Sequence, residues 1–261
     1  MDAVQQRILD DLRRDGIAPF RYEELFGEPP LAELQADIAP FVADNDATDH
    51  GDAPAKKHDF IVRRFLSLEE GAPRPVFAID SPWLRVGASP AVLDVVDAYR
   101  SEPVRMHYLD NWYTVPYTGQ DKRIASQRWH RDPEETNVVK MFLYLSEVDD
   151  GAGPFEYVKG TFEGGRYDGF YPRGDGDLHP PDEALDAAVA PGERVAMKGG
   201  PGSMFVCDTG GFHRGGFART APRILATWSY VSLGFSKPHR FEVDFGGREA
   251  ELPPQVRAAL V

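Results

Sequence analysis

Apolar residues recur with helical spacing in the first part of the chain. Over residues 4–15 the side chains of Val4, Ile8, Leu9 and Leu12 fall on one face, which predicts an amphipathic helix. The polar positions between them are mostly charged, as expected for a helix with one side in solvent. This segment therefore predicts a helix that packs one face against the rest of the protein.

Two further segments carry helix signals. Residues 30–43 have helical spacing, and we expect an interruption at Pro40 because proline lacks the backbone N–H that a helix interior uses. Residues 89–101 begin with Ser89 as N-cap and Pro90 at the first helical position, both of which favour a helix start. Residues 1–101 are thus expected to be mostly helical.

The pattern changes after residue 101, where short runs rich in β-branched and aromatic residues alternate with Gly, Pro and Asp clusters. The predicted strands are 103–115, 138–145, 155–158, 193–198, 203–208 and 223–233. Helices followed by strands indicate a sandwich or barrel with helices packed outside. Residues 162–191 are rich in Gly and Pro and predict a long, lid-like loop.

Charge and cysteine content exclude several classes of protein. The net charge of the 261-residue chain is −13, which disfavours binding to nucleic acid. Cys207 is the only cysteine, so neither an intramolecular disulfide nor a cysteine-based zinc site can form. The N-terminus lacks an apolar signal core, and no apolar run is long enough to cross a membrane. We expect a cytoplasmic protein that acts on a small molecule; the sequence does not predict its oligomeric state.

One histidine and one carboxylate stand just ahead of an apolar run, in QRWHRDPEETNVVKMFLYL (residues 127–145). On an extended strand His130 and Asp132 would point to the same side. His213, in a Gly-rich segment after another predicted strand, is the best third candidate. Two histidines and a carboxylate suit a divalent metal with open coordination positions, as in non-haem Fe(II) oxygenases. H-x-D alone is a weak pattern, so its context decides.

That context resembles the phytanoyl-CoA dioxygenase-like branch of the Fe(II)/2-oxoglutarate oxygenases. The matching segments are WHRDPEETNVVKMFLYLSEVDDGAGPFEYVKGTF and GSMFVCDTGGFHRGGFARTAPRILATWSYV. They carry H-x-D before an apolar strand, then His-Arg-Gly-Gly, and then an arginine ten residues after the histidine. The chain departs from the family at G-T-F, where its members usually show G-S-H. The resemblance implies a double-stranded β-helix, or jelly roll, with its core over 102–235 in a single domain of residues 1–261.

The resemblance also implies cofactors and roles. His130, Asp132 and His213 would hold Fe(II), and 2-oxoglutarate and O2 would be cosubstrates. Arg223 would pair with the distal carboxylate of 2-oxoglutarate, since a guanidinium matches a carboxylate with two parallel hydrogen bonds. Arg219 is a rival for this role. The metal would lie inside one end of the barrel, beneath the 162–191 loop.

Other cosubstrate contacts are open to two interpretations. Gln127 either donates an amide hydrogen bond or ends a strand in solvent. Asn111 and Tyr113 form N-x-Y. Either both face the cosubstrate, or Tyr113 is a core residue and Asn111 is exposed. Lys140 interrupts an apolar strand and either forms an ion pair near the pocket or extends its charge to the surface.

The substrate is described only as a class. The resemblance implies hydroxylation, desaturation or oxidative ring closure of a small molecule, and we expect one from specialised-metabolite or antibiotic biosynthesis. Asp132 argues against halogenation, because related halogenases have a small residue there. Side chains of the long loop either contact this substrate or only pack the loop: Phe162, Arg166, Tyr167, Phe170, Tyr171 and Arg173. The alternatives are a cupin-like metal-dependent isomerase or hydrolase, and a non-catalytic ligand-binding barrel.

Overall fold

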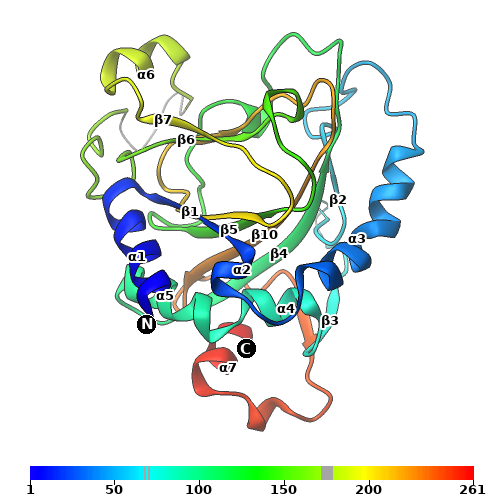
Figure 1. Ribbon diagram of the computed structural model, residues 1–261, viewed down its shortest axis with the longest axis vertical. Coiled ribbons are helices and arrows are strands. Elements are labelled where there is room, and N and C mark those ends of the chain that lie inside the picture. The colour runs from blue at the N-terminus through cyan, green and yellow to red at the C-terminus, as the bar shows by residue number, and fades with distance from the viewer. Residues whose placement is uncertain (68, 70, 172–178) are drawn as a thin grey trace.

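The chain folds into two facing β-sheets with a layer of helices behind the larger one (Figure 1). The computed structural model describes residues 1–67, 69, 71–171 and 179–261. The larger sheet is antiparallel, in the order β1-β8-β5-β10-β4-β2. Its strands are β1 (Ile17–Arg21), β2 (Ile61–Arg63), β4 (Val104–Thr114), β5 (Val139–Tyr144), β8 (Ser203–Asp208) and β10 (Arg223–Ser232).

The smaller sheet closes over one face of the larger one. Its order is β7-β6-β9, formed by β6 (Phe155–Val158), β7 (Arg194–Met197) and β9 (His213–Gly215). Between the sheets the ring of Phe155 lies 5.1 Å from that of Phe142 and 5.0 Å from that of Phe205. A parallel pair, β3 (Val76–Ala78) and β11 (Glu242–Asp244), lies apart. The apolar contact between the sheets makes the interior of a jelly roll.

Helices cover the other face of the larger sheet (Figure 1). They are α1 (Ala3–Asp15), α2 (Tyr22–Leu25), α3 (Leu31–Asp46), α4 (Pro82–Gly87), α5 (Pro90–Arg100) and α7 (Pro254–Leu260), while α6 (Asp182–Ala188) lies beyond the smaller sheet. Along β10 the side chains of Ile224, Ala226 and Trp228 join the helices in one core, and Leu225 joins the core between the sheets. This period-two alternation assigns Arg223 to the inner face.

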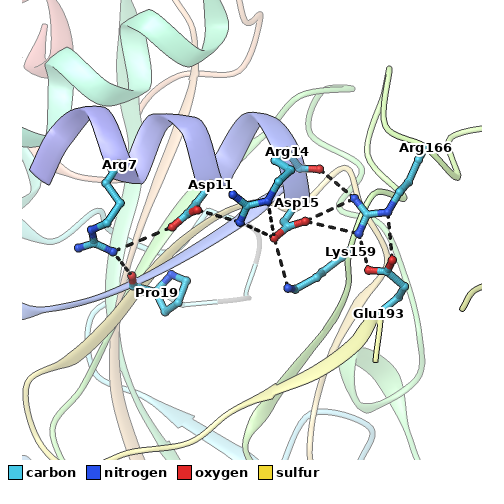
Figure 2. A network of polar contacts seen from close by, with 8 residues as sticks. All are labelled: Arg7, Asp11, Arg14, Asp15, Pro19, Lys159, Arg166 and Glu193. Carbon is cyan, nitrogen blue, oxygen red and sulfur yellow. Dashed lines mark hydrogen bonds and ion pairs between the residues drawn. The ribbon is translucent and has the colours of Figure 1, made fainter. Parts of the chain in front are cut away.

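A polar network fastens α1 to the segment that follows β6 (Figure 2). The carboxylate of Asp15, at the last position of α1, lies 3.2 Å from Lys159 Nζ and 3.4 Å from the Arg166 guanidinium. Arg166 also pairs with Glu193, just ahead of β7. Asp15 is only 6% exposed. The network thus joins the helical layer, the smaller sheet and the start of the long connection.

The structure confirms the predicted fold class and the predicted helices, with corrections of detail. Residues 1–101 also supply three strands, and β1 escaped prediction because it is short and contains Pro19. The helix through Pro40 is uninterrupted. Pro40 lies on the exposed side of α3, as does Ala36, whose carbonyl loses the helical hydrogen bond and remains open to water. Within the described residues, no helix is both long and apolar enough to span a bilayer.

Candidate metal and cosubstrate site

His130 and His213 face each other across a single β-bridge. Each backbone N–H donates to the carbonyl of the other residue, at 3.1 and 3.0 Å, and the two rings lie 4.3 Å apart. β5 begins only at Val139, so His130 and Asp132 precede the predicted strand instead of lying on it. Asp132 is fixed instead by its backbone N–H, which donates to the Thr209 carbonyl at 2.9 Å. The β-bridge between His130 and His213, together with the loop that holds Asp132, therefore brings H-x-D and His213 together.

The three side chains converge at one point. An oxygen of Asp132 lies 3.9 Å from His130 Nε2, and its other oxygen lies 3.5 Å from His213 Nε2. One ligand atom from each residue falls within 4.8 Å of the others. The three side chains that the sequence analysis named as metal ligands thus form one cluster.

Backbone carbonyls orient both imidazoles. The Nδ1 atom of His130 lies 2.8 Å from the carbonyl oxygen of Arg128, and that of His213 lies 3.0 Å from the carbonyl oxygen of Gly211. A carbonyl oxygen only accepts, so each Nδ1 carries the proton. Each Nε2 then presents its lone pair to the cluster, which is the form in which histidine binds a metal.

Burial and neighbouring charges keep the cluster ready for a cation. Burial, with the nearby His130, lowers the pKa of His213 to about 3, and burial also lowers the pKa of His130. Burial alone would raise the pKa of Asp132, but the charge of Lys140 and the two imidazoles hold it below its usual value. At neutral pH the cluster therefore contains two neutral imidazoles, His130 and His213, and one ionised carboxylate, Asp132.

The cluster opens on a cavity of about 200 Å³ between the sheets. Its wall includes Arg223, Leu225, Trp112 and Tyr108 from the larger sheet. The smaller sheet lines the facing side through Phe155, His213 and Gly215, and residues around β2 complete the wall: Phe60, Ile61, Arg63 and Leu66. No described residue of 162–191 lines this cavity, so the expectation that this loop covers the metal finds no support among the described residues.

Arg223 is a buried cation without an anionic partner. It is 2% exposed, and one nitrogen donates to the Gly153 carbonyl while another lies 3.4 Å from the Thr114 hydroxyl. Its Nε has no partner, and no carboxylate of the described residues lies within ion-pair distance. Burial lowers the pKa of Arg223, yet an arginine stays charged. A buried guanidinium without a carboxylate partner among the described residues is suited to bind an anion from the cavity.

The structure separates Asn111 and Tyr113 from the cluster. Tyr113 packs in the core beneath the helices, and its hydroxyl donates to Asp46 in α3 at 2.8 Å. Asn111 pairs in register with Ala226, whose side chain faces the same helical core. The expectation that N-x-Y faces the cosubstrate is therefore corrected: the period of two turns Trp112, between them, to the cavity.

Gln127 lies close to the cavity but is already engaged. It is 1% exposed, and its side-chain oxygen accepts from the Gln120 amide at 2.5 Å and from the Ile124 backbone N–H at 3.1 Å. Ser126, not Gln127, belongs to the cavity wall. Because Gln127 is buried, the interpretation that it ends a strand in solvent is ruled out. Its hydrogen bond with the Gln120 amide indicates a structural role.

Lys140 forms an ion pair in the pocket and does not extend its charge to the surface. Its Nζ lies 2.6 Å from an oxygen of Asp132 and 3.3 Å from Glu134. Sequence reasoning missed other wall residues, such as Tyr108 and Arg240. The alternation along residues 103–115 could have identified Tyr108 once its inward face was known.

The long connection packs onto the barrel through its described residues. Tyr167, Phe170 and Tyr171 join a small apolar cluster around Trp129 and Phe212, and Phe162 is buried. At its far end Asp182 accepts hydrogen bonds from Arg214 at 2.7 Å and from the Trp129 indole. Arg173 lies outside the described residues. These contacts support the packing interpretation of the loop's aromatic residues.

Solved structures share this fold. The epimerase SnoN, in complex with Fe3+, alpha ketoglutarate and nogalamycin RO, is 16% identical over 88% of this chain and 84% of its own, with a TM-score of 0.57. EctD from S. alaskensis, with 2-oxoglutarate and 5-hydroxyectoine, is 18% identical over 94% and 88%, with a TM-score of 0.57. The carbocyclase SnoK from nogalamycin biosynthesis is 15% identical over 98% and 92%, again with a TM-score of 0.57.

These likenesses establish the fold: a jelly roll of the kind found in non-haem 2-oxoglutarate-dependent enzymes. No known family profile matches the chain. No curated protein matches it either. Because one fold can host many functions, the function of this protein has to be inferred from the residues of its site.

Proposed function

We propose that this protein is a non-haem Fe(II)/2-oxoglutarate-dependent oxygenase that oxidises a small molecule. One observation carries the proposal: the buried, unpaired Arg223 and the His130–Asp132–His213 cluster open on the same cavity. A cation site and an anion site that face one cavity fit a ligand that chelates a metal at one end and carries a carboxylate at the other.

The cluster fits Fe(II) by its donors. Two imidazole nitrogens and one carboxylate oxygen are the donor set of non-haem Fe(II) oxygenases, and they leave coordination positions open. The backbone carbonyls of Arg128 and Gly211 already fix both rings with Nε2 toward the cluster. His130, Asp132 and His213 would hold the metal.

The far end of the cavity fits the distal carboxylate of 2-oxoglutarate. Arg223 would bind it, because a guanidinium holds a carboxylate with charge-assisted hydrogen bonds and remains charged when buried. The Thr114 hydroxyl, 3.4 Å from Arg223, would supply a further hydrogen bond. Arg219 is solvent-exposed, with its guanidinium over the Phe217 ring, so it does not compete for this role.

Fe(II) with 2-oxoglutarate supplies the means to activate O2, with release of succinate and CO2 and removal of hydrogen from the substrate. The chain itself binds, orients and shields. Trp112, Phe142, Phe155 and Leu225 give the cavity apolar walls that exclude water from the reacting groups. Lys140 keeps Asp132 ionised and fixed in place. The residues thus prepare the position of the cosubstrate before the substrate is oxidised.

The neighbours' titles support a small-molecule substrate without choosing the reaction. They name an epimerase, a carbocyclase and a protein bound to 5-hydroxyectoine. Hydroxylation, desaturation and ring closure all remain within the proposal. Two of these neighbours come from nogalamycin biosynthesis, which supports a role in specialised-metabolite or antibiotic biosynthesis.

The test is an anaerobic titration of the purified protein with Fe(II) and then 2-oxoglutarate, followed in the visible region. A chelated keto acid gives a weak charge-transfer band. We expect the band in the wild type, its loss in His130→Ala and its weakening in Arg223→Ala. Arg219→Ala is the matched control, since it removes an exposed arginine four residues away, and its band should equal that of the wild type.

Two other results would decide for the rival functions. The protein could bind metal but show no charge-transfer band, with metal binding unaffected by Arg223→Ala. This result would indicate a metal-dependent isomerase or hydrolase. Failure to bind Fe(II), Mn(II) or Co(II) would indicate a non-catalytic binding barrel. Either outcome would refute the oxygenase proposal.

A further inference from the structure

A second, larger chamber adjoins the metal cavity. Its volume is about 820 Å³, and it shares Leu66, Glu134 and Arg240 with the wall of the metal cavity. Pro133, next to the candidate ligand Asp132, also lines it. The inner cavity of about 200 Å³ would be largely taken up by the chelated cosubstrate, so the outer chamber is the space left for a substrate.

Arg240 lies at the junction of the two chambers and has no carboxylate partner. Its guanidinium donates to the Ser67 carbonyl at 2.8 Å, and no acidic side chain of the described residues lies within ion-pair distance. The other charged residues of this wall are Glu69, Arg74, Glu134 and Lys237. Arg74 is paired with Glu242, and Glu134 with Lys140. An unpaired arginine therefore faces the entrance, in a chain whose net charge is −13.

A β-bulge directs His107 into the same chamber. The register of β4 against β10 shifts between Ser229 and Tyr230, which leaves His107 as the extra residue of β4. It is 4% exposed, lines the chamber, and its Nδ1 has no hydrogen-bond partner. Bulges that re-aim a side chain are common beside active sites. Burial and the charges of Arg105 and Arg240 lower the pKa of His107 to about 4, so it is neutral and can both donate and accept.

Two further features complete the junction. A carboxylate oxygen of Glu134 is buried without a partner, so it can accept a hydrogen bond from a bound molecule. Arg105 is buried behind His107 and donates to the Phe235 and Lys237 carbonyls, which fixes the loop that leads to Arg240. The chamber thus offers a held cation, a neutral imidazole and a free acceptor within reach of the metal cluster.

We infer that the substrate is a small acid that also carries a hydroxyl or amino group: its anionic group binds Arg240 and His107, and its hydroxyl or amine donates to Glu134. This inference rests on the proposed function, since it assigns the substrate of that same site. In the empty chamber the buried Glu134 oxygen and the buried His107 Nδ1 lack hydrogen-bond partners, which costs free energy, and the half-buried Arg240 lacks a carboxylate partner among the described residues. A ligand of this chemistry satisfies all three.

The test uses Co(II)-loaded protein with 2-oxoglutarate bound, so that Arg223 is occupied. The probes are hydroxy- and amino-carboxylic acids, each paired with its primary amide, beginning with 4-hydroxybenzoate and 4-hydroxybenzamide. Proton relaxation enhancement by Co(II) falls steeply with distance, so it reports binding beside the cluster. We expect the acids to be enhanced more than their amides, and Arg240→Gln to weaken acid binding about tenfold. Arg240→Lys should restore part of it.

Arg248→Gln is the matched control, because Arg248 is an exposed arginine that pairs with Asp80 and does not line this chamber. The visible spectrum of bound Co(II) and the affinity for 2-oxoglutarate show in each variant that the metal site is intact. Equal enhancement of acids and amides across the panel, with metal and 2-oxoglutarate bound, would overturn this inference alone. Failure of the wild type to bind Co(II) and 2-oxoglutarate would instead refute the proposed function.

Discussion

The Nζ atom of Lys140 lies 2.6 Å from a carboxylate oxygen of Asp132, so a buried ammonium holds a residue that we assign to the metal. Both side chains lie inside the barrel: Lys140 is 5% exposed, and the side chain of Asp132 is 13% exposed. Burial lowers the pKa of a lysine, but the charge of Asp132 reverses this effect and raises the pKa of Lys140. The pair therefore stays charged, and each partner depends on the other.

Replacing this lysine should destabilise the metal-free protein. Lys140→Met leaves a buried carboxylate without its cation, and breaking a buried pair costs about 3–5 kcal/mol. Bound metal would supply the missing charge, so the rise in melting temperature with Mn(II) should be larger in the variant than in the wild type. Thermal unfolding with and without Mn(II) measures both effects.

Lys198→Met is the control for that experiment, because Lys198 forms an exposed pair with Asp150. Its stability should stay within about 0.5 kcal/mol of the wild type. A Lys140→Met protein as stable as this control would show that the buried pair is not needed.

Acid should weaken the metal-free protein below about pH 6.5. The pKa of His213 is lowered to about 3 and that of His130 is also lowered, so the unfolded chain binds protons that the folded chain does not. Stability then rises with pH across this window, by up to about 1.4 kcal/mol per pH unit for each histidine. Urea unfolding at pH 7 and pH 5 measures the slope, and His213→Asn should reduce it. A stability independent of pH in this range would contradict the burial of neutral imidazoles.

Arg223 and Tyr113 should separate cosubstrate binding from packing. Arg223→Gln should weaken 2-oxoglutarate binding by about 2–5 kcal/mol, because it removes the charged partner of a buried carboxylate. Tyr113→Phe removes only the hydrogen bond to Asp46, so it should cost about 1 kcal/mol of stability and leave 2-oxoglutarate affinity unchanged. Calorimetric titration of the Mn(II)-loaded proteins checks both. A large loss of 2-oxoglutarate affinity in Tyr113→Phe would show instead that the N-x-Y pair, Asn111 and Tyr113, belongs to the cosubstrate site.

The network around Asp15 should contribute to stability without touching the chemistry. Asp15→Ala leaves Lys159 and Arg166 without their shared carboxylate (Figure 2), and because both cations are partly exposed the expected loss is about 1–2 kcal/mol. Asp11→Ala, on the exposed side of the same helix, should cost less than about 1 kcal/mol. Chemical denaturation measures the difference, and metal affinity should be unchanged in both variants. Equal losses would show that Asp15 is not the anchor.

The sequence allowed the fold and the centre of the site to be predicted, but not its surroundings. His130, Asp132, His213 and Arg223 were proposed because their spacing follows a family pattern. The order of helices and short strands indicated a sandwich or barrel, and the family resemblance implied the jelly roll. The face of β4 could not be predicted, because a period of two is symmetric: Asn111 and Tyr113 alternate with Trp112, and only the register against β10 shows which set faces inward. The roles proposed for His107 and Arg240 in substrate binding could not be predicted either. A β-bulge places His107 and a distant loop places Arg240, and no local sequence pattern encodes either feature.

The metal and cosubstrate sites can be tested directly by a crystal structure of the protein grown without oxygen in the presence of Mn(II) and 2-oxoglutarate. We expect an anomalous manganese peak bound by His130 Nε2, His213 Nε2 and the Asp132 carboxylate, with the keto acid on the metal and its distal carboxylate on Arg223. Manganese at another place, or 2-oxoglutarate bound away from Arg223, would contradict this expectation.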